Sequence, residues 1–172
     1  MSDENDYDAI IHGNQSIDDR EELSSYLKSV FLQIPEQEAS TILVKRSVHF
    51  ILPGANCTAE KLLINSGLVD KEHKIFYPVW LIILSQDILK KPNHEIIYTL
   101  SHELAHAFLE HSLGVDSLDI AKEREIEADK KVIEWGFENE LKKTPYNYIY
   151  GNGIKNIFGE DEKERGDKTI VN

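Results

Sequence analysis

The segment His102-Glu103-Leu104-Ala105-His106 constrains this chain more than any other feature, because its two histidines can act together only on a helix. Each residue of an α-helix advances by about 100°, so His102 and His106 would lie about 40° apart on one face. Two imidazoles one turn apart can reach the same metal ion, and Glu103 lies beside them, where its carboxylate can hold a water molecule. The alternative is an ordinary amphipathic helix whose polar face carries two histidines by chance.

The residues around this motif predict a helix with a single polar stripe. Asn93 follows Pro92 as a candidate N-cap, and neither Gly nor Pro occurs from there to His111, with Gly114 as the next helix breaker. The rest of the helix surface is largely apolar, so we expect a buried helix that lines a cleft. On this helix His111 would lie about 140° from His106, in the apolar sector. We therefore expect His111 to be a packing or hydrogen-bonded histidine and not a metal ligand.

A second helix is predicted downstream. Asp116 or Ser117 can cap a helix that runs from about Leu118 to Trp135, and Gly136 can end it. Apolar residues recur along it at helical spacing and define one face that should be buried. A catalytic metal site needs a third ligand, and we expect that ligand on this face.

Glu125 lies in the middle of the predicted buried face, and Asp129 lies beside it, one turn further on. A carboxylate at the centre of an apolar face is costly unless it is paired or bound to a metal ion. Glu127 points to the opposite face and is interpreted as solvated. The alternative for Glu125 and Asp129 is a buried salt bridge with a partner elsewhere in the chain.

Together the two segments resemble a known family. The H-E-x-x-H motif is followed, 19 residues after its second histidine, by Glu125-x-x-Ala128-Asp129. This pairing is similar to that of the gluzincin metallopeptidases, in particular the HtpX and CAAX-prenyl protease type and the ImmA/IrrE type, and it covers the chain from about Trp80 to Phe137. The resemblance implies one zinc ion per chain, with these roles: His102, His106 and Glu125 as ligands, Glu103 as general base, and Asp129 as a carboxylate that orients a ligand histidine.

The activity that the resemblance implies is hydrolysis of a peptide bond in a protein or peptide substrate. Glu103 would take a proton from a water molecule activated by zinc and deliver it to the leaving amine. Zincins often add a residue that stabilises the oxyanion, and the candidates are Tyr146, Tyr148 and Tyr150, for which a Tyr-rich structural loop is the alternative. One alternative function is a zinc-binding, non-catalytic regulator with the same fold, although binding zinc needs no base and Glu103 is intact. Another is an interaction module in which the motif is accidental.

The rest of the chain predicts one α+β, zincin-like domain, in which a small, mostly antiparallel sheet packs on the H-E-x-x-H helix and on the second, ligand-bearing helix. The domain would span residues 17–158, between a flexible N-terminus at residues 1–16 and a disordered polar tail at residues 159–172. The other predicted elements are a helix at Ile17–Gln33, a strand at Val44–Leu52, one or two strands within Lys74–Ser85, and an ambiguous segment at Ala59–Asn65. Trp80–Ser85 is a candidate edge strand for binding an extended peptide, with a plain core strand as the alternative.

Composition limits the binding partners and the cellular location that we expect for this chain. A formal net charge of −12 argues against nonspecific binding to nucleic acid or to an anionic membrane. The sequence does not begin with a basic and apolar leader, and its longest apolar run, Val79–Leu84, is too short to span a bilayer. The single cysteine, Cys57, fits a reducing compartment, so we expect a cytoplasmic protein.

Overall fold

The computed structural model describes residues 21–45, 48–54, 58–65, 76–85, 87–111 and 117–151. Its elements in chain order are α2 (Glu21–Gln33), α3 (Glu36–Ser40), the π-helical turn η1 (Thr41–Lys45), β1 (Val48–Gly54), β2 (Thr58–Asn65), β3 (Phe76–Ser85), the 3₁₀ turn η2 (Ile88–Lys90), α4 (Asn93–Leu109), α5 (Leu118–Glu134) and α6 (Glu138–Lys143). The predicted N-terminus at 1–16 and the predicted tail at 159–172 lie outside the described residues.

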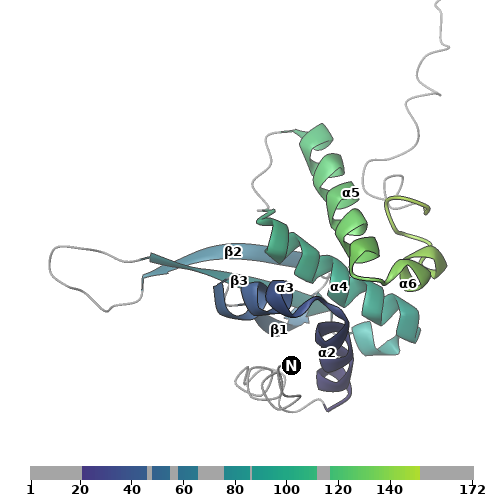
Figure 1. Ribbon diagram of the computed structural model, residues 1–172, viewed down its shortest axis with the longest axis horizontal. Helices are drawn as coiled ribbons and strands as arrows, with labels where there is room; N and C mark the ends of the chain where they lie inside the picture. The colour runs from purple at the N-terminus through teal and green to yellow at the C-terminus, as the bar shows by residue number, and fades with distance from the viewer. Residues whose placement is uncertain are drawn as a thin grey trace, which may run out of the picture.

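The sheet is mixed, with the strand order β1-β3-β2 (Figure 1). β1 runs parallel to β3, with Val48 opposite Trp80, whereas β2 runs antiparallel to β3, with Thr58 opposite Ile83. The α+β class is therefore confirmed, but the expectation of a mostly antiparallel sheet is corrected, since one of the two pairings is parallel. The physical reason is that β3, although it is the last of the three strands in the chain, lies between β1 and β2 in the sheet and pairs with both.

The predicted edge strand at Trp80–Ser85 lies instead in the middle of the described sheet. Each residue from Trp80 to Ile83 has a partner in β1 on one side and in β2 on the other. The side chains of Trp80, Ile82 and Leu84 are fully buried. The prediction of an edge strand is thus wrong, and the core strand is confirmed.

β1 begins at Val48 and not at Val44, where the run of β-branched residues starts. Val44 lies in η1, which continues directly from α3, and its side chain is exposed. At the other end of the strand, the pairing with β3 shifts between Ile51 and Gly54. Pro53 lies in this irregular stretch, and its missing N–H is tolerated there because β1 is an outer strand of the described sheet.

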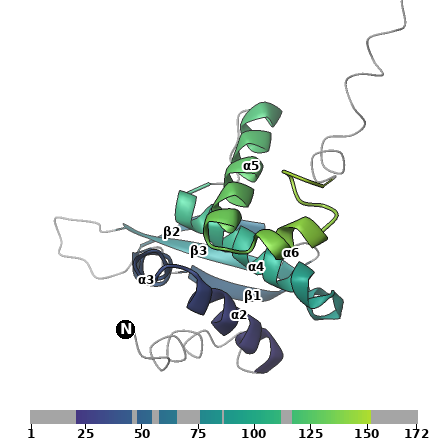
Figure 2. The same ribbon diagram turned by 45° about the vertical axis from the view of Figure 1, so that its right-hand side comes forward.

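α4 forms the centre of the molecule, between the sheet on one side and α5 and α6 on the other (Figures 1 and 2). Its apolar residues at helical spacing are fully buried: Ile96, Leu100, Leu104 and Ala107. This burial confirms the sequence prediction of a buried helix with one polar stripe. Within the part of the chain that the structure describes, no helix is both long enough and apolar enough to cross a membrane.

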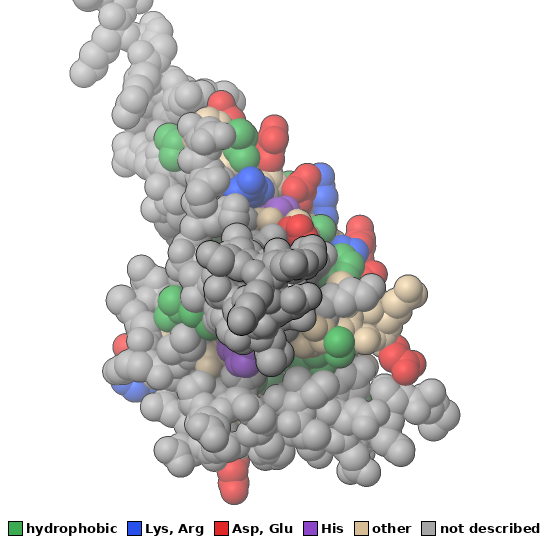
Figure 3. All heavy atoms as spheres, turned by 90° about the vertical axis from the view of Figure 1, so that its left-hand side faces the viewer, with side chains coloured by type: hydrophobic (Ala, Val, Ile, Leu, Met, Phe, Trp, Pro, Cys, Tyr) green, Lys and Arg blue, Asp and Glu red, His purple; other side chains and the backbone are tan. Residues whose placement is uncertain are grey.

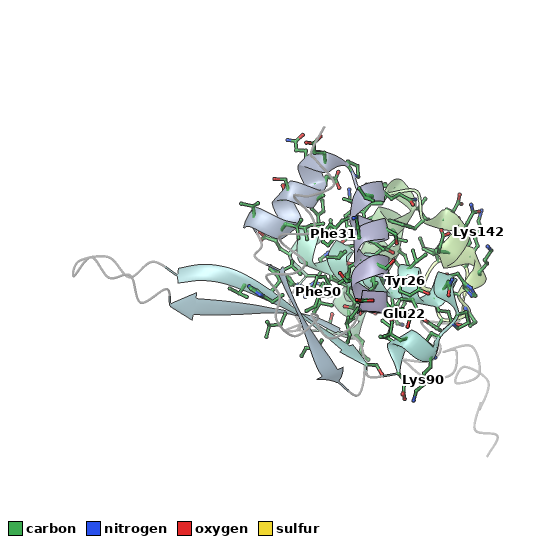
Figure 4. All side chains as sticks on the ribbon, turned by 90° about the horizontal axis from the view of Figure 1, so that it is seen from below. Glu22, Tyr26, Phe31, Phe50, Lys90 and Lys142 are labelled. Carbon is green, nitrogen blue, oxygen red and sulfur yellow. The ribbon has the colours of Figure 1, made fainter. Side chains whose placement is uncertain are left out.

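α2 packs against α4, and its described residues agree with the predicted helix up to Gln33. Phe31 of α2 and Phe50 of β1, both labelled in Figure 4, are buried and belong to the same hydrophobic core. The hydroxyl of Tyr26 donates a hydrogen bond to Oδ1 of Asn93 over 2.8 Å. This bond joins α2 to the first residue of α4, so the start of the site helix is held in place.

α5 begins and ends close to its predicted bounds. The Ser117 hydroxyl accepts a hydrogen bond from the Ile120 backbone N–H over 3.3 Å, as an N-cap should, and Gly136 takes up a φ of 89° just beyond the helix. Beyond its exposed first turn, the exposed residues of α5 recur at helical spacing: Glu123, Glu127, Lys130 and Glu134. Figure 3 shows side chains of both charges on the upper part of the molecule, where α5 stands in Figure 1. The opposite face of α5 packs against α4 and carries the carboxylates of the site.

Candidate metal centre

The polar stripe of α4 is buried despite its charge. His102, Glu103 and His106 are only 6%, 8% and 9% exposed, and they lie where α5 covers α4. Burying three ionisable side chains side by side is costly unless each has a partner or the group binds an ion. The stripe therefore points to a site and not to a solvated helix face.

Three ligand atoms from two helices converge at this stripe. His102 Nε2 lies 3.0 Å from His106 Nε2 and 3.0 Å from Oε2 of Glu125, and His106 Nε2 lies 3.5 Å from the same oxygen. Among the described residues, these three form the group of His, Cys, Asp and Glu side chains that could hold a metal ion. The structure thus brings together the three residues predicted as ligands, although His102 and Glu125 are 23 positions apart in the chain.

The spacing of these atoms suits a small tetrahedral ion. Ligand atoms about 2.0–2.1 Å from a tetrahedral metal ion lie about 3.3 Å from one another. The three observed separations, 3.0, 3.0 and 3.5 Å, bracket that value. Two imidazole nitrogens and one carboxylate oxygen also make up the donor set found in catalytic zinc sites with a free fourth position. The residues present therefore fit a metal ion of this kind.

Asp129 fixes the orientation of the first candidate ligand, His102. Its Oδ1 lies 2.9 Å from Nδ1 of His102, so Nδ1–H donates to the carboxylate and Nε2 keeps its lone pair for a metal ion. The Tyr98 hydroxyl donates to the same oxygen over 2.8 Å, while Oδ2 accepts the backbone N–H groups of Tyr148 and Ile149. With four donors this fully buried carboxylate is well satisfied, and Asp129 has the contact that its predicted role requires.

The electrostatics of the cluster follow from these contacts. Burial alone would lower the pKa of His102, but the hydrogen bonds to Asp129 and Glu125 outweigh it and raise that pKa to about 10. Burial alone would likewise raise the pKa of Glu125, but the hydrogen bonds from His102 and His106 hold it well below its usual range. The group is thus a cluster of mutually compensating charges, in which a cation can take the place of a proton.

A short strap after α6, residues 144–151, closes the site from the side. Asn147 organises this strap, because its Nδ2 donates to the backbone oxygens of Leu141 and Thr144 and its Oδ1 accepts the N–H groups of Tyr150 and Gly151. Asn147 is 1% exposed. The turn that it holds presents two backbone N–H groups to the buried carboxylate of α5. Sequence reasoning missed this connection.

The three candidate tyrosines have different surroundings. The Tyr146 hydroxyl donates to Glu95 and lies 3.5 Å from Oγ1 of Thr99, and the Tyr150 hydroxyl donates to Glu138, so neither hydroxyl bonds to a candidate ligand in these contacts. The Tyr148 ring stacks on the imidazole of His102, with ring centroids 5.6 Å apart and planes 16° from parallel. Of the three, Tyr148 is therefore the one that the structure brings to the ligand cluster.

Glu103 shares the environment of Tyr148. Burial raises the pKa of the Tyr148 hydroxyl above its usual value, and the negative charges of Glu125, Asp129 and Glu103 raise it further. The Glu103 carboxylate is therefore close enough to act on this hydroxyl electrostatically. Tyr98, another partner of Asp129, was also missed, although it lies one turn before His102 on the same helix face.

His111 lies next to the site, contrary to its predicted position on the apolar face. α4 ends at Leu109, because Glu110 adopts a left-handed conformation with a φ of 61°. The chain then turns back, and Nδ1 of His111 lies 3.1 Å from Nδ1 of His106. The expectation of a hydrogen-bonded histidine is confirmed, but the helical angle used for it does not apply beyond the helix end.

Glu127 is exposed, as expected, but it is not only solvated. Its Oε2 lies 3.1 Å from Nε2 of His111, and its side chain remains 58% exposed. Burial, followed by the charge of His106, lowers the pKa of His111 to about 4. The His111 imidazole thus lies between Glu127 and His106, in surroundings that disfavour its protonation.

The chain was compared with models of protein families, with curated proteins and with solved structures, and none of the three comparisons gave a match. A function for this chain is therefore inferred from the geometry of the centre.

Proposed function

We propose that this chain is a zinc-dependent metallopeptidase of the gluzincin type, built on a zincin-like domain. The observation that carries the proposal is the convergence of His102, His106 and Glu125 within 4.8 Å of one another, with Glu103 buried on the same stripe of α4. A site that served only to bind zinc would not need a buried carboxylate beside its ligands. The fully satisfied Asp129 adds support, because such a partner fixes a ligand histidine in the required tautomer.

Zinc is the proposed ion because of the donor set and the spacing of its atoms. Two imidazoles with one carboxylate are a catalytic zinc set, and three protein ligands leave one position open for substrate. Zinc bound there would supply a Lewis acid that polarises a carbonyl group and lowers the pKa of a water molecule to near neutrality. One ion per chain follows, because the described residues form a single group of this kind.

The side chains around this position have different proposed roles in the reaction. Glu103 acts as the general base, accepts a proton from water at its carboxylate and passes that proton to the leaving amine. His102, His106 and Glu125 bind the ion, and Asp129 keeps Nδ1 of His102 protonated. Tyr148 is the proposed donor to the oxyanion, supported by its stacking on His102 and by a hydroxyl that is protonated at neutral pH.

The proposed substrate is a peptide bond in a protein or peptide. A net charge of −12 disfavours nonspecific contacts with nucleic acid or anionic membranes, so neither is a proposed partner. The single cysteine fits a reducing compartment, and we propose a cytoplasmic location on that ground.

Replacing Glu103 by glutamine tests this proposal directly. The glutamine keeps the size of the side chain and can still hydrogen-bond water, but it cannot accept a proton. The variant should bind zinc and fold like the wild type, yet hydrolyse peptides about 10²–10⁴-fold more slowly. The measurement compares the two proteins on a diverse peptide library, with chelator treatment and zinc re-addition. Glu123→Gln, on the exposed face of α5, is the matched control and should cleave like the wild type.

Two outcomes would count against this assignment. If Glu103→Gln cleaves as fast as the wild type, Glu103 is not the base and the mechanism is wrong. If the wild type binds zinc but cleaves nothing, the non-catalytic zinc-binding regulator becomes the better description of this chain.

A further inference from the structure

We propose that His111 positions the second ligand, His106, by accepting the hydrogen on its Nδ1, and that Glu127 holds His111 in the tautomer that this requires. This inference rests on the proposed metal centre and names two residues whose role the ligand motif does not include. His111 would act through His106 and not on the substrate, so it is a positioning residue.

The two ligand histidines have the same requirement. Each points Nε2 at the shared position, so each must carry its hydrogen on Nδ1, and that hydrogen needs an acceptor in a buried site. For His102 the acceptor is the Asp129 carboxylate, 2.9 Å away. For His106 the partner of Nδ1 is the Nδ1 atom of His111, 3.1 Å away.

A histidine can serve as that acceptor only in one tautomer. Nδ1 of His111 must be free of hydrogen, which places the hydrogen on Nε2. Glu127 favours this tautomer, because its carboxylate oxygen lies 3.1 Å from Nε2 and accepts that hydrogen. Asp129 accepts the Nδ1 hydrogen of His102 directly. For His106 the same hydrogen is accepted by His111, and Glu127 holds His111 in the tautomer that can accept it.

The backbone at the end of α4 places His111 for this contact. The N–H of His111 donates to the backbone oxygen of His106 over 3.0 Å, and the N–H of Glu110 donates to that of Ala107 over 3.4 Å. With a left-handed residue at Glu110, these two bonds form a Schellman motif. The motif turns the chain back over the last turn of α4, which brings the two imidazoles to a centroid distance of 5.2 Å.

Metal affinity provides a test that does not depend on peptide cleavage. His111→Phe fills the same space without an acceptor and should weaken zinc binding about 10–100-fold, as Asp129→Asn should at the other ligand. His111→Gln offers an amide oxygen and should recover most of that affinity. Competition with a chelator measures all three variants. His94→Phe, on the first turn of α4, is the matched control and should bind zinc like the wild type.

Glu127 should matter only through His111. Glu127→Gln should weaken zinc binding less than His111→Phe, and the double variant should be no weaker than His111→Phe alone, because the two changes break the same sequence of contacts. In the zinc-loaded protein, ¹⁵N NMR should find the hydrogen of His111 on Nε2. The visible spectrum of the cobalt-substituted protein should change in His111→Phe and return towards the wild-type spectrum in His111→Gln.

The possible failures can be told apart. If His111→Phe keeps wild-type zinc affinity and cobalt spectrum, or if the hydrogen of His111 lies on Nδ1, this inference is overturned while the proposed enzyme stands. If the wild type binds zinc, and His111→Phe weakens that binding as expected, but the wild type cleaves no peptide, only the proposed function fails. If the wild type takes up no zinc, both are wrong.

Discussion

Tyr148 contributes three different groups to the centre. Its backbone N–H donates to Oδ2 of Asp129 over 2.6 Å, its ring stacks on His102, and its hydroxyl has a pKa that burial and the negative charge of Glu125 raise. The first two contacts hold a ligand in place and do not need the hydroxyl. The hydroxyl is therefore the one part of Tyr148 that is available for chemistry, and a single-atom deletion separates the two roles.

Tyr148→Phe should lower kcat by about 10²-fold, the cost of removing one donor to an oxyanion, while zinc affinity changes little. Tyr146→Phe and Tyr150→Phe are the matched controls, because their hydroxyls donate to Glu95 and Glu138 and should not affect turnover. Steady-state kinetics on one cleaved peptide, with zinc content measured in parallel, checks all three variants. An equal loss in the three would mean that the strap, and not this hydroxyl, matters for the reaction.

At the scale of single residues, the sequence predicted the three candidate ligands and the Asp129 carboxylate beside them, but not the other donors to that carboxylate. His102 and His106 follow from helical spacing alone, and Glu125 from the cost of a carboxylate on a buried face. The donors from the strap could not be predicted, because a backbone N–H is carried by almost every residue and leaves no trace in the sequence. Their position depends on where the chain turns after α6.

Among the elements, the end of α4 shows why His111 was misplaced. A helix is expected to end at glycine, and Gly114 was the next one in the sequence. The structure ends the helix five residues earlier, at Leu109, with Glu110 in the left-handed conformation that side chains rarely adopt. No local signal marks this ending, so an angle calculated along a continuous helix failed for the residue beyond it.

The strap is the other element whose conformation determines the geometry of the site. Gly151 closes it, with its N–H donating to Oδ1 of Asn147 over 2.8 Å. A Cβ atom at Gly151 would lie 2.5 Å from the backbone oxygen of Pro145 and 2.9 Å from both the backbone oxygen and Nδ2 of Asn147. These are contacts with backbone and with a buried side chain, so the strap itself would have to move.

Gly151→Ala should therefore affect both the stability of the protein and the zinc site, because the whole strap would shift. We expect a loss of about 1–3 kcal/mol in the free energy of unfolding, the usual cost of overpacking. We also expect weaker zinc binding, because the two N–H groups on Asp129 would shift with the strap. Thermal unfolding and chelator competition measure the two effects. Asn139→Ala, on α6, is the control; a Gly151→Ala variant that is destabilised yet binds zinc normally would show that the strap does not position Asp129.

For the whole molecule, α4 separates the ligand group from most of the hydrophobic core. Most of the largest buried side chains lie among α2, the sheet and the apolar face of α4, for example Phe31, Leu27, Trp80, Ile82 and Leu100, although the core also extends to Leu141 of α6. The site lies on the opposite side of α4, under α5 and the strap. The sequence predicted the α+β class from its helical and β-rich segments, but not the strand order, because pairing with β3 on both sides depends on contacts between distant segments.

Zinc removal should therefore lower stability without unfolding the protein. The core does not contain the ligands, and His102 and Glu125 pair directly at 3.0 Å. A ligand that binds only the folded state at 100 times its Kd adds about 2.7 kcal/mol. For a chain of this length that corresponds to a Tm roughly 5–11 °C higher with zinc than with chelator.

Glu125→Gln checks the origin of this difference, since it should remove most of the zinc-dependent rise in Tm. Calorimetric scans of both proteins with zinc and with chelator make the comparison. Unfolding of the wild type by chelator at room temperature would mean that zinc is part of the core and that the separation at α4 is wrong. An unchanged Tm would mean that the three ligands do not bind zinc at all.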